Sequence, residues 1–254
     1  MDKTNRNRTS KLVGLIANVQ GHEVKAVAGS FLFVVLLMSA YYILRPVRDA
    51  MASDWSDAEV SWLWTLNFFI STAVVALYGA LVARFPLRFL VPATYGIFAL
   101  TFLFFYALAS LSSDRTLVDK SFYVWVSVFS LFHISVFWSF MSELFSKEQA
   151  GRLFGIIAAG ASVGGLIGPS IPSFFSAYLG TDNLLLLASA MLVLPIPLIF
   201  YLQALKISDL GNEALAATSP SARIGGNPFA GFTLFISNPY LLAIGLFILL
   251  YTGI

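Results

Sequence analysis

Seven runs of apolar residues, separated by charged or turn-forming joints, dominate the pattern of the chain. A bilayer core about 30 Å thick takes about 20 helical residues to cross. Backbone N–H and C=O groups must be paired within lipid, and continuous apolar runs of this length favour helices over barrel strands. The predicted spans are residues 26–44, 60–83, 87–111, 122–141, 153–175 and 184–204, with a seventh that begins near Phe232 or Tyr240. The pattern therefore predicts an all-α membrane protein.

Composition supports this class and excludes others. The chain is 58% hydrophobic and 11% charged, whereas a soluble domain carries about 25% charged residues. Its net charge of +2 is too small to indicate nucleic acid as a partner. There is no cysteine, and the two histidines, His22 and His133, are far apart in sequence, so we expect no metal site and no cofactor. No nucleophile triad or phosphate-binding glycine loop is present, so we do not expect an enzyme.

Lys and Arg are unevenly divided between the two sets of joints. Eleven lie in the basic tail 1–25 and in the joints that follow the second, fourth and sixth spans, and four lie in the other joints. The positive-inside rule therefore predicts a cytoplasmic amino terminus. The apolar run after Lys25 is too long for a signal-peptide core, so it is interpreted as a retained span. We expect a multi-pass protein of the bacterial inner membrane.

The joint at 205–231 is rich in Gly, Ser, Ala, Asn and Pro and predicts a flexible cytoplasmic linker. It separates a six-helix block, 26–204, from the start of a second block at 232–254. Within the first block, span starts recur at an offset of about 95 residues, which predicts a 3+3 inverted repeat. The seventh run is still apolar at Ile254, so we expect an amino-terminal portion whose partner is a missing carboxy-terminal half. A seven-span protein with a short outer terminus is the alternative.

The fifth predicted span carries regularly spaced glycines. Gly160, Gly164 and Gly168 recur every four residues and share one helix face, Gly155 precedes them, and Pro169 follows. Small residues let a neighbouring backbone approach closely, and a proline removes a backbone donor and favours a bend. Two interpretations are open: tight helix packing, or a bendable helix that packs against the opposite block while the two blocks rock.

These residues resemble a motif of the major facilitator superfamily. Exchangers of that family often carry, in the fifth span, Gly, eight residues, Gly, three residues, Gly-Pro, two residues and Gly-Gly; Gly155, Gly164, Gly168 and Pro169 match it, and Pro172-Ser173 replaces the last pair. A second motif of that family lies in the joint after the second span. There Gly79, Arg84 and Arg88 match, whereas Ala83 and Pro86 replace an Asp and a Gly, so the charged gate latch is half present. The resemblance covers the whole chain and implies a half-bundle of transporter fold.

A narrower resemblance is to the ATP/ADP translocases, which exchange nucleotides, and to their bacterial relatives. It rests on the strings YYILRPVRD at 41–49, FWSFMSELFS at 137–146 and EQAGRLFG at 148–155. The relatives include many of unknown cargo, so these strings do not fix a substrate. The resemblance implies exchange of an anionic solute such as a nucleotide.

Arg45 and Arg48 lie about one turn apart, with Asp49 on the side of Arg45. Two guanidinium groups can form a fork for phosphate or carboxylate. The competing interpretation is an interfacial cluster at the end of the first span, paired internally through Asp49. Pro46 adds a third possibility, in which the helix breaks and the arginines turn inward.

Other polar residues interrupt the predicted spans. His133 lies mid-span, where an ionisable group is costly; it either binds substrate or a proton, or bonds to a neighbouring helix. Asn67 and Ser71 in the second span, and the serine stripe of residues 135, 139 and 142, either line a polar cavity or join helices. Trp138 either stacks on a substrate ring or packs. For four other residues an ordinary structural role is expected. Trp62, Trp64 and Trp125 are expected in the interfacial belt, and Glu143 is expected in solvent or paired with Arg152.

The sequence therefore predicts a secondary active transporter of the major facilitator type, driven by gradients or exchange because no ATPase domain is present. Its substrate is expected between this block and the missing half. The alternative is a non-transporting membrane scaffold or sensor fused to a further domain beyond residue 254.

Overall fold

The computed structural model describes residues 19–212 and 230–252, so the basic tail up to residue 18 and the linker at 213–229 lie outside the described residues. The described residues form helices and no strand. In chain order the helices are α2 (Val24–Met51), α3 (Asp57–Val82), α4 (Leu87–Leu111), α5 (Thr116–Leu144), α6 (Lys147–Leu179), α7 (Thr181–Val193), α8 (Pro195–Ser208), α10 (Ala230–Ser237) and α11 (Pro239–Thr252).

Six of these segments are long and apolar enough to cross a membrane, when residues 182–208 are taken as one. The third predicted span matches α4 at both ends. α2, α5 and α6 extend beyond their predicted bounds at both ends, whereas α3 begins three residues earlier and ends one residue earlier than predicted. The sixth span divides into α7 and α8 because Pro195 has no N–H to donate to the preceding turn and instead begins a new helix. The seventh predicted span likewise divides, between α10 and α11 at Asn238.

The alternative in which Pro46 breaks the first span is wrong. α2 continues through Pro46 to Met51. Leu44 and Val47, on either side of the proline, are 0% and 2% exposed, so tertiary packing compensates for the one missing hydrogen bond. Membrane helices tolerate proline where neighbouring helices support the backbone in this way. As a result, Arg45 and Arg48 stay on a regular helix.

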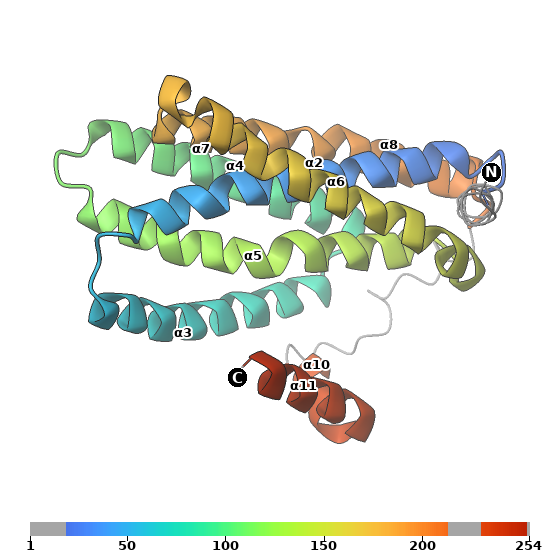
Figure 1. The fold of residues 1–254 in the computed structure, drawn as a ribbon. Coiled ribbons are helices and arrows are strands. Elements are labelled where there is room, and N and C mark those ends of the chain that lie inside the picture. The colour runs from blue at the N-terminus through green and yellow to red at the C-terminus, as the bar shows by residue number, and fades with distance from the viewer. Residues whose placement is uncertain (1–18, 213–229, 253–254) are drawn as a thin grey trace, which may run out of the picture.

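α2 lies at the centre of the bundle, between α6 on one side and α4, α7 and α8 on the other (Figure 1). The helix pairs follow the symmetry of the inverted repeat. α2 packs on α6, and the equivalent pair across the repeat, α5 and α3, also packs together. α2 likewise packs on α7 and α8, as α5 packs on α4, and the contacts α2–α5 and α4–α7 join equivalent helices to each other. The described block therefore has the 3+3 arrangement of a transporter half-bundle.

α3 is the least enclosed of the six. Only Leu63 and Ser71 of its residues are buried, whereas α2 and α5 each bury about half of their length. α3 begins at a capping box, in which Ser56 and Glu59 satisfy each other's backbone N–H groups. The helix is thus fixed at its start and exposes much of its length, which leaves recesses on two of its faces.

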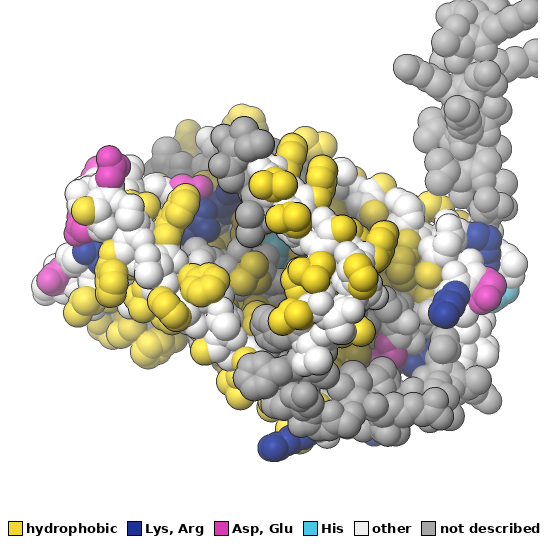
Figure 2. All heavy atoms as spheres, turned by 90° about the horizontal axis from the view of Figure 1, so that it is seen from below, with side chains coloured by type: hydrophobic (Ala, Val, Ile, Leu, Met, Phe, Trp, Pro, Cys, Tyr) yellow, Lys and Arg dark blue, Asp and Glu magenta, His cyan; other side chains and the backbone are white. Residues whose placement is uncertain are grey.

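Aromatic side chains fill the core between α2, α4 and α5. Phe33 meets Tyr95 and Phe137 edge-to-face, with ring centroids 5.5 and 5.1 Å apart, the arrangement that aromatic quadrupoles favour. Tyr95 is fully buried, and its hydroxyl donates to the backbone oxygen of His133 at 2.9 Å. On the face shown in Figure 2, hydrophobic side chains predominate and most charged side chains lie towards the two ends of the bundle, as expected for a lipid-embedded middle.

Candidate functional site

A polar recess lies where α2, α3 and α5 meet, near the end of the bundle at which α2 ends and α5 begins. It has a volume of about 350 Å³. Its lining residues are Arg48 from α2, Trp64 and Asn67 from α3, and Tyr123, Ser127, Ser130 and Leu131 from α5. The two sequence-predicted residues Arg48 and Asn67 therefore come together in one recess.

Arg48 is held firmly in this recess. Its Nε and Nη2 donate to Asp49 Oδ1 at 2.9 and 2.7 Å, and its Nη1 donates to Ser127 Oγ at 3.2 Å. The guanidinium also lies over the Tyr123 ring, 5.2 Å from its centroid, a cation–π contact. These bonds use three of the five N–H donors of an arginine. Two remain without an acceptor among the described residues.

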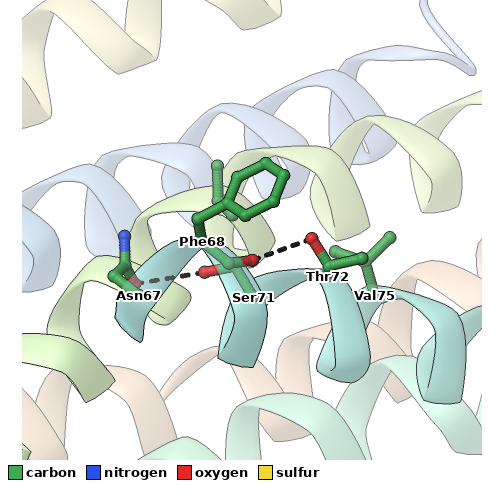
Figure 3. Close-up of a pocket in the computed structure, with 6 residues that line it drawn as sticks. Asn67, Phe68, Ser71, Thr72 and Val75 are labelled. Atoms are coloured by element: carbon green, nitrogen blue, oxygen red, sulfur yellow. Dashed lines mark hydrogen bonds between the residues drawn. The ribbon is translucent and has the colours of Figure 1, made fainter. Parts of the chain in front are cut away.

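A second recess, of about 330 Å³, continues along α3 and shares Asn67 and Leu131 with the first. In Figure 3 the Ser71 hydroxyl is bonded to Asn67, by donation to Oδ1 at 3.1 Å, and the Thr72 hydroxyl donates to the backbone oxygen of Phe68 at 2.8 Å. The amide oxygen of Asn67 is thus engaged within α3. The Asn67 amide nitrogen points away from that bond in Figure 3 and is available as a donor.

Arg45 lies outside both recesses. Its side chain is 49% exposed, and its Nε is 3.8 Å from Asp49 Oδ2 one turn further along. The Asp49 carboxylate therefore lies between two arginines, and the three groups together carry one net positive charge. Asp49 pairs the two arginines internally, as the competing interpretation expects, and Arg48 alone lines a recess. The two guanidinium groups therefore do not form a fork at one cavity.

His133 lies deeper in the bundle than Arg48. It is six residues beyond Ser127 on α5, about 9 Å along the helix at 1.5 Å per residue. Its side chain is 4% exposed and stacks on Tyr41 of α2, with centroids 4.4 Å apart. Neither ring nitrogen has a hydrogen bond of good geometry to the described chain. The histidine is thus enclosed by the core and does not line the recess.

Trp138 and the serine stripe of α5 also lie apart from the recess. Trp138 is half-buried and packs against Phe137 and Phe154, with centroids 5.1 and 5.2 Å away. Ser139 and Ser142 are exposed and donate to the backbone of their own helix, four residues back. Neither group approaches Arg48.

The glycine face of α6 packs against α2 of the same block. A Cβ on Gly164 would lie 2.6 Å from the backbone oxygen of Val35, and one on Gly160 or Gly168 would meet α2 at 2.7 or 2.6 Å. Ser39 Oγ donates to the Gly164 backbone oxygen at 3.4 Å. By contrast, a Cβ on Gly155 would meet nothing within 4 Å. α6 continues through Pro169 to Leu179, so the close approach is made within the block by three of the four predicted glycines.

The gate-loop residues lie at the turn between α3 and α4. Gly79 is in the last turn of α3, where its oxygen accepts the Ala83 N–H at 3.1 Å. Arg84 and Arg88 are exposed, and Arg88 lies over the Phe89 ring at 4.7 Å. Neither arginine forms an ion pair within the described part of the chain.

At this same end, three ion pairs connect helix termini. Arg152 Nη2 lies 2.6 Å from Glu23 Oε1, Lys25 pairs with Asp209, and Lys206 pairs with Glu143 at 3.5 Å. The expected pairing of Glu143 with Arg152 is therefore wrong, because Glu23 takes the arginine. Burial raises the pKa of Glu23, but hydrogen bonds from Arg152 and the Gln20 N–H outweigh it and hold the pKa below its ordinary value of 4.5.

Sequence reasoning missed five lining residues of the polar recess, four of them polar or aromatic and the fifth Leu131. Tyr123, Ser127 and Ser130 recur at helical spacing on the face of α5 that also carries His133, and this periodicity could have identified them. Trp64 was expected only in the interfacial belt, but its Nε1 donates to the Tyr123 hydroxyl at 2.8 Å. The assembled recess offers a guanidinium, an amide, hydroxyls and two aromatic rings, which together can bind a planar or aromatic anion.

A protein-family model described as Major Facilitator Superfamily matches residues 30–254. The matched range includes α2 from Ser30 onward and every later described helix up to α11. No curated protein and no solved structure shows a significant match to the chain.

Proposed function

Because the chain belongs to the major facilitator superfamily, a family of transporters, we propose that it moves a small anionic solute by secondary active transport with alternating access. The solute binds at the polar recess formed by Arg48, Asn67 and the first half of α5. A second helical block packs opposite this recess and completes the site, and the two blocks rock about it. The cargo is exchanged for another solute, as in the nucleotide exchangers that the sequence resembles.

The main support for the proposal is the burial and hydrogen bonding of the Arg48 side chain. Its side chain is only 16% exposed, yet it lines a cavity and has two N–H donors to spare. A charged group that is largely enclosed by protein is costly unless it serves binding or pairing. Asp49 pairs with Arg48 and offsets its charge. Arg45, which also pairs with Asp49, leaves the three groups with one net positive charge beside the recess. An anion is the ligand that this charge favours.

Two features favour a cargo with an aromatic ring. Trp64 and Tyr123 form adjacent walls of the recess and are joined by a hydrogen bond. The Trp64 ring is 66% exposed and suits stacking with a planar group, whereas the Tyr123 ring is covered by Arg48. Arg48 and the hydroxyls suit phosphate or carboxylate. A nucleotide has both parts, which agrees with the resemblance of the strings around Arg45 and Trp138.

The proposed orientation places the amino terminus in the cytoplasm of a bacterium, with the protein in its inner membrane. The Lys and Arg distribution supports this orientation. The Arg48 recess then lies towards the outer side, and the turn with Arg84 and Arg88 lies on the cytoplasmic side, where the gate latch of the family is expected.

Uptake by proteoliposomes that contain the full-length protein tests the proposal. A panel of labelled anions, including nucleotides, would be offered with and without internal anion. Arg48→Gln should lower the rate of anion uptake by roughly tenfold or more, since about 1.4 kcal/mol of lost binding corresponds to a factor of ten. Arg45→Gln should have a smaller effect, because Arg45 acts through Asp49.

Lys25→Gln is the matched control, because it removes a cation at the opposite end of the bundle and should leave uptake unchanged. Equal uptake by wild type and Arg48→Gln across the panel would contradict the assigned site. Absence of uptake of every anion by the wild type would contradict the anionic cargo.

A further inference from the structure

A third recess, separate from the polar one, lies on a different face of α3 and is bounded by α4 and α5. Its volume is about 480 Å³, within the range of small-molecule sites. The walls are apolar and aromatic, and include Leu63, Leu66, Ile70, Phe105, Val124 and Trp125. Leu63 and Val124 form a buried floor, at 4% and 5% exposure. This apolar recess shares no lining residue with the Arg48 recess.

Lys120, one of the residues that line the apolar recess, forms an ion pair with Glu59. Lys120 Nζ donates to Glu59 Oε1 at 2.7 Å, and both side chains remain accessible, at 26% and 46% exposure. Ser56 holds the other carboxylate oxygen of Glu59 at 2.9 Å, and Lys120 lies 5.9 Å from the centroid of the Trp55 ring. The charges are thus fixed by their neighbours while still open to a ligand.

The position of these groups determines what kind of molecule fits. Glu59 is in the first turn of α3 and Lys120 is in the second turn of α5, so the ion pair lies at the membrane surface. The apolar walls extend from there along the helices towards the middle of the membrane. Trp62 and Trp125 flank the recess at the level where indole rings favour the interface. A molecule with a charged head and a hydrocarbon tail matches this order.

We infer that the apolar recess binds a phospholipid whose headgroup is a phosphate plus a primary amine, as in phosphatidylethanolamine. The phosphate would lie against the Lys120 ammonium and the amine against the Glu59 carboxylate, with one acyl chain along Leu66 and Ile70. The opposite charges of Lys120 and Glu59 favour this headgroup over purely anionic or trimethylated ones. A purely anionic headgroup is repelled by Glu59, and a trimethylated amine has no N–H to donate to it.

Competition between lipids tests the inference without any need for the cargo. The full-length protein in detergent would be mixed with equal amounts of phosphatidylethanolamine, phosphatidylcholine and phosphatidylglycerol, and retained lipids would be counted by native mass spectrometry. The wild type should retain one phosphatidylethanolamine in preference to the other two. Lys120→Gln and Glu59→Gln should each weaken that retention by roughly fivefold, which corresponds to about 1 kcal/mol. Leu66→Trp, which fills the recess, should remove it.

Two controls separate this site from general lipid contact. Lys25→Gln breaks an exposed ion pair at the opposite end of the bundle, and Leu111→Trp adds the same bulk at a side chain that is 83% exposed; both should keep the preference. Glutamine can take the place of glutamate in a capping box, so α3 should still form in Glu59→Gln. Helix content measured by circular dichroism checks this. Preference for phosphatidylglycerol, equal retention of all three lipids, or unchanged retention in the Lys120 and Glu59 variants would each overturn the inference.

Discussion

Glu23 and Arg152 form an ion pair that joins the start of α2 to the first turns of α6, across 129 residues of sequence. The two guanidinium nitrogens of Arg152 donate to the two carboxylate oxygens of Glu23, at 2.6 and 3.2 Å. Glu23 is 1% exposed, and Arg152 is 30% exposed. A bidentate pair with one buried partner fixes the angle between two helices at their ends. This pair connects α6 to α2 at one end of their interface. Further along, Gly160, Gly164 and Gly168 let the two helices pack closely.

Replacement of Glu23 by Gln should destabilise the protein by about 2 kcal/mol, because Arg152 loses a charged acceptor and the buried site keeps only part of its hydrogen bonding. Thermal unfolding of the detergent-solubilised protein measures this effect. The control is Lys25→Gln, which breaks the pair with Asp209. Lys25 is 67% exposed and 3.6 Å from its partner, so its loss should cost no more than about 0.5 kcal/mol. Equal stability of the two variants would contradict a special role for Glu23.

The same carboxylate predicts a dependence of stability on pH. The pKa of Glu23 is lower in the folded protein than its ordinary value of 4.5. A group with a depressed folded pKa contributes stability that is complete above the unfolded pKa and is lost as the pH falls through the folded pKa. The melting temperature should therefore fall as the pH is lowered below 4.5. Glu23→Gln should show a shallower fall, and identical pH profiles would contradict the assignment.

The membrane-spanning architecture could be predicted from the sequence because lipid imposes a simple rule on the composition of each span. The helix bounds at Leu87 and Leu111 follow from Pro86 just before the helix and the polar Ser112 just after it. Interruptions were harder to predict. Pro46 and Pro195 have the same local chemistry, yet α2 continues through the first and the sixth span divides before the second. Packing of the surrounding turns decides between these outcomes, and packing involves helices distant in sequence.

The candidate site, too, could be predicted only in part, because it depends on packing between helices that are distant in sequence. Arg48 stood out as one of two arginines just beyond the first predicted span, and Asn67 as a polar residue within the second, so both could be chosen as candidates from the sequence. Trp64 could not be separated from ordinary belt residues, because only the crossing of α2, α3 and α5 brings it beside Arg48. The helical spacing of Ser127 with Tyr123 and Ser130, by contrast, was visible in the sequence. Glu143 is a similar case: sequence proximity favoured Arg152, but the fold places Lys206 beside it.

Substitution at two glycines of α6 should have opposite effects. Gly164→Ala places a Cβ 2.6 Å from a backbone oxygen of α2, and a backbone atom cannot move aside without separating the helices. We expect a loss of about 2 kcal/mol or more, as for other overpacked sites. Gly155→Ala meets open space and replaces a poor helix former, so it should be neutral or stabilise by up to about 1 kcal/mol. Thermal unfolding of both variants measures the difference, and a destabilising Gly155→Ala would contradict the geometry.

Replacement of His133 by Phe separates a structural role from a functional one. The ring of His133 is buried and stacked on Tyr41, and its nitrogens lack hydrogen bonds of good geometry. Phenylalanine has nearly the same shape, keeps the stack and removes two polar atoms that are costly to bury. We therefore expect the variant to be as stable as the wild type, or more stable by about 1 kcal/mol, in thermal unfolding.

The transport assay then decides why a histidine occupies this position. If the ring binds cargo or a proton during transport, His133→Phe lowers uptake although the protein is stable, and the dependence of uptake on external pH changes with it. Tyr41→Phe is the matched control, because it keeps the aromatic stack and leaves the imidazole in place. Unchanged uptake and an unchanged pH profile in His133→Phe would show that the histidine serves packing alone. A large loss of stability would instead show that its nitrogens are bonded in the folded protein, contrary to the geometry described above.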